Sequence, residues 1–409
     1  MFRKIIFTLG TSIAFSTSPA TAEQARPIVS YYSIADRVRK ENPDLAAARF
    51  RVEEAMGRLS QAGRLTNPEL RIETASNQRF RERSLTVGFS QKFPLTDRLR
   101  LEKEVGASDV RIAQAEIAEL ERELVAQARQ AVIEYLSLNR QRNLRKEQIK
   151  LVEELGSSLR KIAAKGEISA LDVGLVKLET LQLTTELRQY DAQEKALNGV
   201  IKPLLGMALD APLIIGGDLE QMTTEALPTD LNRRGDIRAA KHSIIGASKQ
   251  VELEQARRYD DIEVGVFASA ERTEDAPEGF ETEGIIGVGV TIPFPWWNKN
   301  EGNIAEAKAR VRRKQSELTA LERAVMHKAK AAREEMIEWA GLVREIDNTL
   351  FPAAAEQLAL AEKTYGEGQT DIQTVLRSRE QKLRLETSRI AAVEAFHKAR
   401  ANYESQLGY

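Results

Sequence analysis

The feature that most constrains the fold is a helical stretch much longer than an ordinary globular domain. Residues 98–165 contain no proline, and their only glycines are Gly106 and Gly156. A helix rises about 1.5 Å per residue, so this stretch predicts a rod up to roughly 100 Å long. Near its end, apolar residues recur at the three- or four-residue spacing of a coiled-coil seam, namely Val152, Leu155, Leu159 and Ile162. The stretch therefore predicts a long helix that packs against a second helix.

The same plan occurs a second time along the chain. Residues 302–365 form another long helical stretch, which contains the single proline Pro352. Each long stretch ends at a glycine turn, and a shorter helical stretch follows the turn, at about 170–202 and 371–406. Both halves predict helix, two strands, long helix, turn and helix, which is a two-fold internal repeat and not a short-period solenoid.

Four segments alternate apolar and polar residues, which predicts strands with one apolar face. These segments are 70–73, 85–90, 262–266 and 286–292. The polar stretches 74–83 and 271–283 connect them into two hairpins, one in each half. In the last strand, Ile286, Val288 and Val290 are expected on the apolar face, and Gly287 and Gly289 on the other.

Two isolated hairpins would leave strand edges and an apolar surface exposed. Four strands cannot close a barrel wide enough for a pore, whereas lipid requires every backbone N–H and C=O group to be paired. The sequence therefore predicts an α+β membrane protein in which several chains contribute strands to one β-barrel. Lipid would contact the apolar face, including Ile286, Val288 and Val290, and a tube of long helices would continue the barrel.

The N-terminal residues have the order of a secretory signal peptide. Arg3 and Lys4 precede an apolar run at 5–15, and the small residues Ala20 to Ala22 follow, so cleavage is expected after Ala22. Beyond this point there is no apolar run near the roughly 18 residues of a membrane helix. We therefore expect an exported protein that is periplasmic, secreted or a β-barrel, and not a helical inner-membrane protein.

Composition argues against several functional classes. The chain has no cysteine, which excludes disulfides, thiolate metal sites and cysteine nucleophiles. Lys and Arg number 60 against 61 Asp and Glu, so no basic excess points to nucleic acid. His242, His327 and His397 lack metal-ligand spacing. We therefore expect no enzyme activity, no cofactor and no bound metal.

The sequence resembles the TolC-like outer-membrane efflux family over essentially its whole mature length. The resemblance is carried by the segments NPDLAAAR (42–49), FSQKFPL (89–95), VTIPFP (290–295) and YGEGQTDIQTVLRSREQKLRLE (365–386). The segment NKNEGNIAEAKA (298–309) is more similar to the heavy-metal (cobalt–zinc–cadmium, CzcC-like) branch. The resemblance implies a homotrimer in the bacterial outer membrane, with four barrel strands per chain and a large periplasmic part. It also implies a periplasmic membrane-fusion adaptor and an inner-membrane resistance–nodulation–division pump as partners.

The resemblance also implies roles for particular residues. The two helical turns of such channels contact the adaptor, and they correspond here to Gly166, Glu167, Ser169, Gly366, Gly368 and Gln369. Glycine is expected in these turns because the chain reverses there with positive φ. Family members often carry aspartates at a periplasmic gate, whereas this chain offers Asp172, Asp371, Thr374 and Arg377. Trp296 and Trp297, at the end of the last strand, are expected at the membrane interface.

The resulting interpretation divides the chain into 1–22 (signal peptide), 23–206 (first repeat), 207–229 (a linker packed outside the helices) and 230–409 (second repeat). The expected function is an efflux channel subunit, most simply for heavy-metal cations. Two alternatives stay open on the sequence alone. One is the same fold serving multidrug efflux or type I secretion, and the other is a periplasmic coiled-coil scaffold without a pore.

Overall fold

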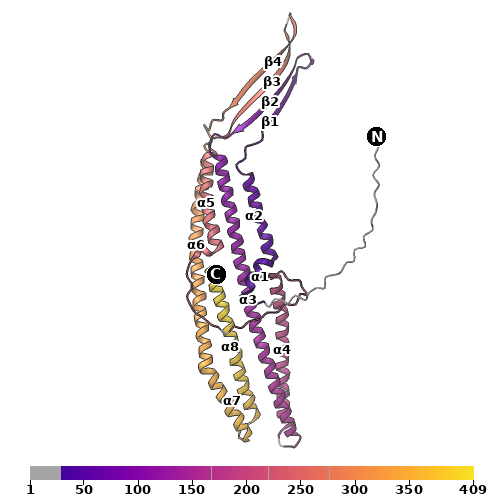
Figure 1. Cartoon of the computed structure of the whole chain (residues 1–409), viewed down its shortest axis with the longest axis vertical. Coiled ribbons are helices and arrows are strands. Elements are labelled where there is room, and N and C mark those ends of the chain that lie inside the picture. Colours follow the sequence, from indigo (N-terminus) through magenta and orange to yellow (C-terminus); the bar gives the residue numbers. More distant parts are fainter. Residues whose placement is uncertain (1–28, 167, 220, 276) are drawn as a thin grey trace, which may run out of the picture.

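The computed structural model describes residues 29–166, 168–219, 221–275 and 277–409 and shows an elongated molecule (Figure 1). A β-sheet lies at one end, a helical bundle forms the middle, and two helical turns lie at the opposite end. The expected signal peptide at 1–22, together with Glu167 of the first turn, lies outside the described residues.

The first half has the element order that the sequence predicts. Its elements are α1 (Ile34–Glu41), α2 (Pro43–Gln61), β1 (Glu69–Ser76), β2 (Arg83–Phe93), α3 (Arg98–Ala163) and α4 (Ala170–Leu204). The start of α2 has a local cause: the Asn42 side chain accepts a hydrogen bond from the Leu45 amide at 2.9 Å, and Pro43 occupies the first turn. The 66 residues of α3 correspond to about 100 Å of unbroken helix.

The second half repeats this order with one difference in its long helix. Its elements are η1 (Leu231–Arg233), α5 (Gly235–Ala256), β3 (Ile262–Asp275), β4 (Gly279–Thr291), α6 (Glu301–Glu345), η2 (Ile346–Leu350), α7 (Phe351–Gly366) and α8 (Ile372–Gln406). The element η2 is a π-helical turn directly before Pro352. Proline has no amide hydrogen to donate, so a wider turn accommodates it and the chain stays helical from α6 into α7.

The four strands form one antiparallel sheet in the order β1-β2-β3-β4. The two predicted hairpins are present, and pairing of β2 with β3, for example Phe89 opposite Val266, joins the two halves. The predicted connectors at 74–83 and 271–283 were too long, because β1 continues to Ser76 and β3 to Asp275. Backbone pairing needs no apolar side chains, so the ladder extends beyond the alternating segments.

The helix α3 is the common packing partner of the chain. It contacts α1, α2, α4, α5 and α8 along its length. Its central part contributes Val132 to a core shared with Ile34, Leu45 and Ile201 from α1, α2 and α4. At Gly235, the first residue of α5, an added Cβ would overlap backbone atoms of α3, so this crossing requires glycine. The base of the sheet therefore stands on a tightly packed helical bundle.

A buried charge network holds the start of α5 against α3 and the C-terminal end of α8. The Arg234 side chain is 5% exposed and pairs with Asp236 at 2.6 Å. Arg234 also donates to the Gln406 backbone carbonyl at 3.0 Å, and Arg122 of α3 donates to the Ser405 carbonyl at 3.1 Å. These bonds satisfy helix-terminal carbonyls and connect three elements that are distant in sequence.

The segment 207–229 crosses the helices at mid-height (Figure 1). Among its described residues, regular pairing is limited to an isolated parallel bridge between Val29 and Ile215. Further along, side chains of α8 hold it in place: His397 Nε2 lies 2.5 Å from the Leu219 carbonyl oxygen, and the Tyr403 hydroxyl accepts from the Leu227 amide at 3.2 Å. The segment thus runs beside the C-terminal part of α8. None of the described helices has both the length and the apolar composition needed to cross a membrane.

Candidate functional site: the sheet and the helical tips

One face of the sheet is apolar across all four strands. The register places Leu70, Phe89, Val266 and Val288 in one row, and Ile72, Val87, Ala268 and Ile286 in the next. Ile286 and Val288 are 88% and 71% exposed, and Val290 is also exposed. A contiguous apolar surface of this kind indicates contact with another apolar phase or protein. The register pairs the apolar positions of neighbouring strands, so the alternation within each strand produces one continuous apolar face.

The opposite face of the sheet is polar and carries more acidic than basic residues. Thr86 and Ser269 share a hydrogen bond at 3.0 Å across β2 and β3. The register puts six glutamates on this face, namely Glu69, Glu73, Glu263, Glu271, Glu281 and Glu283. The basic residues among the paired positions of this face are Arg71 and Lys92. Closely spaced like charges attract cations to such a surface.

An aromatic residue that the sequence analysis missed interrupts the polar face. Phe267 of β3 is paired with Gly88 and Gly287 on the neighbouring strands. A Cβ added at Gly287 would overlap the Phe267 ring, so the ring occupies the space that a side chain at position 287 would take. The signal was present in the sequence, because Phe267 stands where alternation calls for a small or polar residue.

The two tryptophans are placed beyond the last strand and not within it. β4 ends at Thr291, and Trp296 and Trp297 lie in the bend that precedes α6. Both are strongly exposed, at 74% and 96%. The expectation that they end the strand was therefore wrong: Pro293 and Pro295 have no amide hydrogen for a sheet ladder, so pairing stops before them. Their position between sheet and bundle is compatible with a membrane interface.

The first tip joins α3 to α4 and lies at the end of the molecule opposite to the sheet (Figure 1). Gly166 has φ of 80°, as the sequence predicts for a chain reversal. Ser169 starts α4 as its N-cap, where its hydroxyl accepts from the Leu171 amide at 3.1 Å. Ser169 therefore has a structural task in addition to any contact with a partner.

The second tip joins α7 to α8 and is a regular helix stop signal. Gly368 has φ of 71°, its amide donates to Tyr365 at 3.0 Å, and the Gln369 amide donates to Thr364 at 2.9 Å. This pair of bonds is the Schellman motif. Gly366 is the last residue of α7 and does not have a positive φ. The expectation of positive φ at Gly366 was therefore wrong. One left-handed residue is sufficient to end the helix.

The candidate gate residues occupy the first turns of α4 and α8. Asp371 is the N-cap of α8, and its Oδ1 accepts from the Thr374 hydroxyl at 2.7 Å and from the Thr374 amide at 2.8 Å. These bonds, with the charge of Arg377, lower the pKa of Asp371. Asp172 stands three residues after the N-cap of α4, as Thr374 does in α8. Burial, and then the charge of Asp172, raise the pKa of Tyr365 at the second tip.

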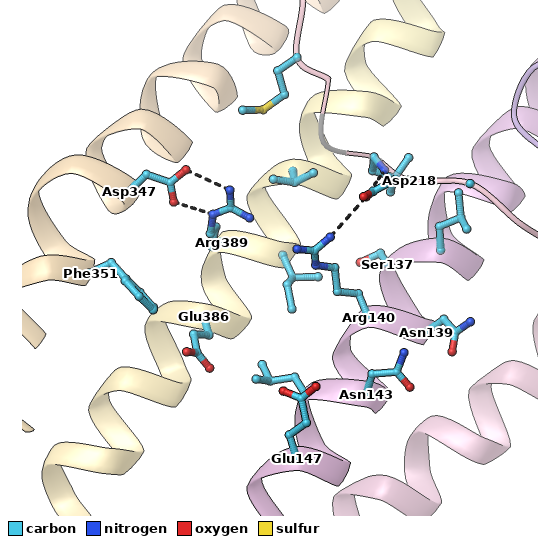
Figure 2. Close-up of a pocket in the computed structure, with 17 residues that line it drawn as sticks. Ser137, Asn139, Arg140, Asn143, Glu147, Asp218, Asp347, Phe351, Glu386 and Arg389 are labelled. Carbon is cyan, nitrogen blue, oxygen red and sulfur yellow. Dashed lines mark hydrogen bonds and ion pairs between the residues drawn. The ribbon is translucent and has the colours of Figure 1, made fainter. Parts of the chain in front are cut away.

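A cavity of about 670 Å³ lies between α3 and α8, below the segment 207–229 (Figure 2). Two ion pairs occupy its upper part: Arg389 with Asp347, at 2.5 Å, and Arg140 with Asp218, at 3.3 Å. Glu386 and Glu147 lie lower in the view, on opposite walls. In the described part of the chain, no group of three or more His, Cys, Asp or Glu is arranged to hold a metal ion.

Known proteins that share this combination of sheet, long bundle and paired tips are outer-membrane channels, to which the chain is similar. Residues 34–201 match the family described as "Outer membrane efflux protein". This match runs from α1 into α4, so the chain is similar to that family over its first half. It has 21% identity over 336 residues to the cobalt-zinc-cadmium resistance protein CzcC of Cupriavidus metallidurans, covering 78% of each chain.

Solved structures with the same fold cover nearly the whole chain. CusC superposes with a TM-score of 0.77 at 15% identity, covering 92% of both chains. The outer-membrane channel OprN gives 0.75 at 17% identity, covering 92% of this chain and 89% of that one. The outer membrane protein VceC of Vibrio cholerae gives 0.71 at 18% identity, with 92% and 96% covered. At these identities the likeness establishes the fold.

Proposed function

We propose that this chain is one of three identical subunits of an outer-membrane channel that exports heavy-metal cations. In the assembly, each chain contributes its four strands to a common β-barrel, and the helices form a tube in the periplasm. The channel itself performs no chemistry. An inner-membrane pump supplies the energy, and a periplasmic adaptor connects the pump to the helical tips.

The observation that carries this proposal is the combination of one apolar face with two edge strands. β1 and β4 form the edges of the sheet. Lipid provides no hydrogen-bond partner for edge backbone groups, so a sheet with a lipid-facing side must close on itself. Pairing of β1 with β4 of another copy closes it, with the exposed Ile286, Val288 and Val290 toward lipid. The number of copies rests on the family resemblance.

The choice of cargo rests on two observations. The polar face, which would line the barrel, carries six glutamates against Arg71 and Lys92. Acidic rings favour cations in a channel, and weak, distributed charges let them leave again. In addition, the relative from Cupriavidus metallidurans is a cobalt-zinc-cadmium resistance protein. Both observations support divalent metal cations over anionic cargo.

The test of the barrel uses two neighbouring positions on opposite faces of β4. Val288→Arg places a charge on the apolar face, at a cost of roughly 2–4 kcal/mol near the centre of a bilayer. Gly289→Arg is the matched control, because a side chain at position 289 enters open space on the polar face. We expect the first variant to be lost from the outer-membrane fraction and the second to be retained. Equal insertion of both variants contradicts the face assignment.

Two further measurements separate this function from its alternatives. The mass of the detergent-extracted protein should equal three chains, and a monomer with full secondary structure would contradict the barrel. Deletion of the gene should lower tolerance to cobalt, zinc or cadmium salts and leave tolerance to organic drugs unchanged. The opposite pattern assigns the channel to drug efflux.

A further inference from the structure

The two halves of the chain form two helical arms below the segment 207–229. The first arm consists of α4 with the lower part of α3, and the second of α7, α8 and the π-helical turn η2. The arms meet near the tips in an apolar cluster that includes Val152, Val176, Ala361 and Val375. They meet again higher up, where Ile133 packs with Ala401. The cavity of about 670 Å³ separates α3 from α8 between these two contacts.

Opposite charges hold each arm together internally. In the first arm, Arg142 of α3 pairs with Asp191 of α4 at 2.8 Å, and Arg145 pairs with Glu186 at 2.8 Å. In the second arm, Arg379 of α8 pairs with Glu362 of α7 at 2.6 Å. Ion pairs therefore connect the two helices of each arm.

Across the arms, carboxylates face carboxylates in the cavity. Glu147 of α3 and Glu386 of α8 project into it from opposite walls (Figure 2). Glu386 Oε2 is buried and has no hydrogen-bond partner in the described part of the chain. On its own helix, Lys382 lies at the loose distance of 3.9 Å from Oε1.

The remaining charged groups around Glu386 have other partners. Arg389, on the same helix, pairs with Asp347 of η2. Arg140, on α3, pairs with Asp218 of the segment 207–229. These two arginines line the same cavity, and their positive charges are offset by these aspartates.

Protonation should bring the arms together. Burial is the main cause that raises the pKa of Glu386; Lys382 lowers it, and the charge of Glu147 raises it by a smaller amount. A raised carboxyl pKa means that packed arms bind protons more tightly than separated arms, so packing becomes more favourable as pH falls through the raised pKa. At neutral pH the same groups are charged and repel.

We propose that Glu147 and Glu386 form an acid-sensitive joint, which separates the two arms at neutral pH and lets them close on acidification. The π-helical turn η2, at the top of the second arm, gives that arm a place to bend. That closing of the arms would narrow the mouth of a channel rests on the proposed function. The distance between the arms can be measured whether or not the chain forms a channel.

The experiment uses the absence of cysteine in the chain. Nitroxide labels are attached to cysteines at Ser158 of α3 and Gln373 of α8, two exposed positions on opposite arms. Labelled chains are diluted with unlabelled ones, and pulsed electron–electron dipolar spectroscopy records the distance within one chain at pH 7.5 and pH 5. We expect the mean distance to shorten at pH 5 by roughly 1–2 Å, the size of helix shifts at packed interfaces.

The variant Glu147→Gln/Glu386→Gln should show the short distance at both pH values. Glu153→Gln/Glu356→Gln is the matched control, because it removes two exposed carboxylates from the same arms. This control should respond to pH as the unmodified chain does. A pH-independent distance in the unmodified chain overturns the proposal, and so does an unchanged pH response in the Glu147/Glu386 variant. The mass of the detergent-extracted protein tests separately whether three chains assemble into a channel.

Discussion

The ring of Phe267 on β3 lies across Gly287 on β4, in the space that a side chain at 287 would occupy. The two residues face each other directly in the ladder. A backbone hydrogen-bond ladder beside a glycine lacks side-chain cover on that face, and the neighbouring ring supplies it. The pair thus stabilises the polar face at a point where the strand has little else to pack.

This pair gives the first prediction. Gly287→Ala should destabilise the protein by about 1–3 kcal/mol, because the added methyl group overlaps the ring and forces it from its position. In a protein that already carries Phe267→Ala, the change Gly287→Ala should lower the stability much less. Thermal unfolding of the four proteins of this double-mutant cycle, in detergent, measures the coupling. Gly289→Ala, which enters open space, serves as the control.

The second prediction concerns the buried guanidinium of Arg234. Arg234→Met should destabilise the protein by roughly 1–3 kcal/mol, because it removes the ion-pair partner of Asp236 and leaves the Gln406 carbonyl without its donor. Arg238→Met, on the exposed side of the same helix, should stay within about 0.5 kcal/mol. Denaturant unfolding monitored by circular dichroism compares them. Similar stabilities of the two variants would show that the network contributes little.

Acid should weaken the same network, and this is the third prediction. Burial acts to raise the pKa of Asp236, but hydrogen bonds and the charge of Arg234 outweigh it, so this pKa lies below its ordinary value of 3.8. A lowered carboxyl pKa contributes stability above the ordinary value, and the contribution is lost as pH falls through the lowered value. Asp236→Asn should therefore lower stability at pH 7 and flatten its pH dependence below about pH 4. Unfolding curves between pH 2 and 7 measure this slope.

The fourth prediction separates docking from chain reversal at the tips. Ser169→Asp keeps a side chain able to cap α4 and adds a negative charge, and Gln369→Arg changes a residue that the turn uses through its backbone. If the adaptor binds here, both variants should form normal amounts of trimer and yet lose resistance to the exported compound. Full resistance at normal trimer abundance would mean that the adaptor docks elsewhere.

A backbone variant provides the matching control for the turn itself. Gly368→Val should lower the abundance of folded protein, because a β-branched residue resists the φ of 71° found there. Gly366→Val should be milder, since Gly366 lies within α7 with helical backbone. Western blots of membrane fractions distinguish these outcomes from a loss of docking alone.

Periodic features of the fold were predictable from sequence, and pairings between distant segments were not. The absence of proline from 98–165 predicts α3 almost to the residue, because nothing within it interrupts the backbone hydrogen bonds. Alternation likewise predicts the apolar face of β4. The pairing of β2 with β3 had no such signal, since it depends on packing of helices that lie between them in sequence.

The candidate site was predictable to a similar degree. Gly166 and Gly368 were identified because a tight reversal after a long helix requires a left-handed residue. The capping roles of Ser169 and Asp371 follow from where the helices start, which sequence locates only within a few residues. The approach of Glu147 to Glu386 was not predictable, because each is an ordinary polar helix position until the arms are placed side by side.

The unbroken α3 and the π-turn between α6 and α7 give the two halves of the chain different mechanical properties. A continuous helix resists bending over its whole length, so α3 connects the base of the sheet to the first tip as a rigid strut. The second long helix has a weaker point near Pro352, where the regular hydrogen-bond ladder is interrupted. A force applied at the tips would therefore be transmitted along α3 in the first half and would bend the long helix of the second half near Pro352.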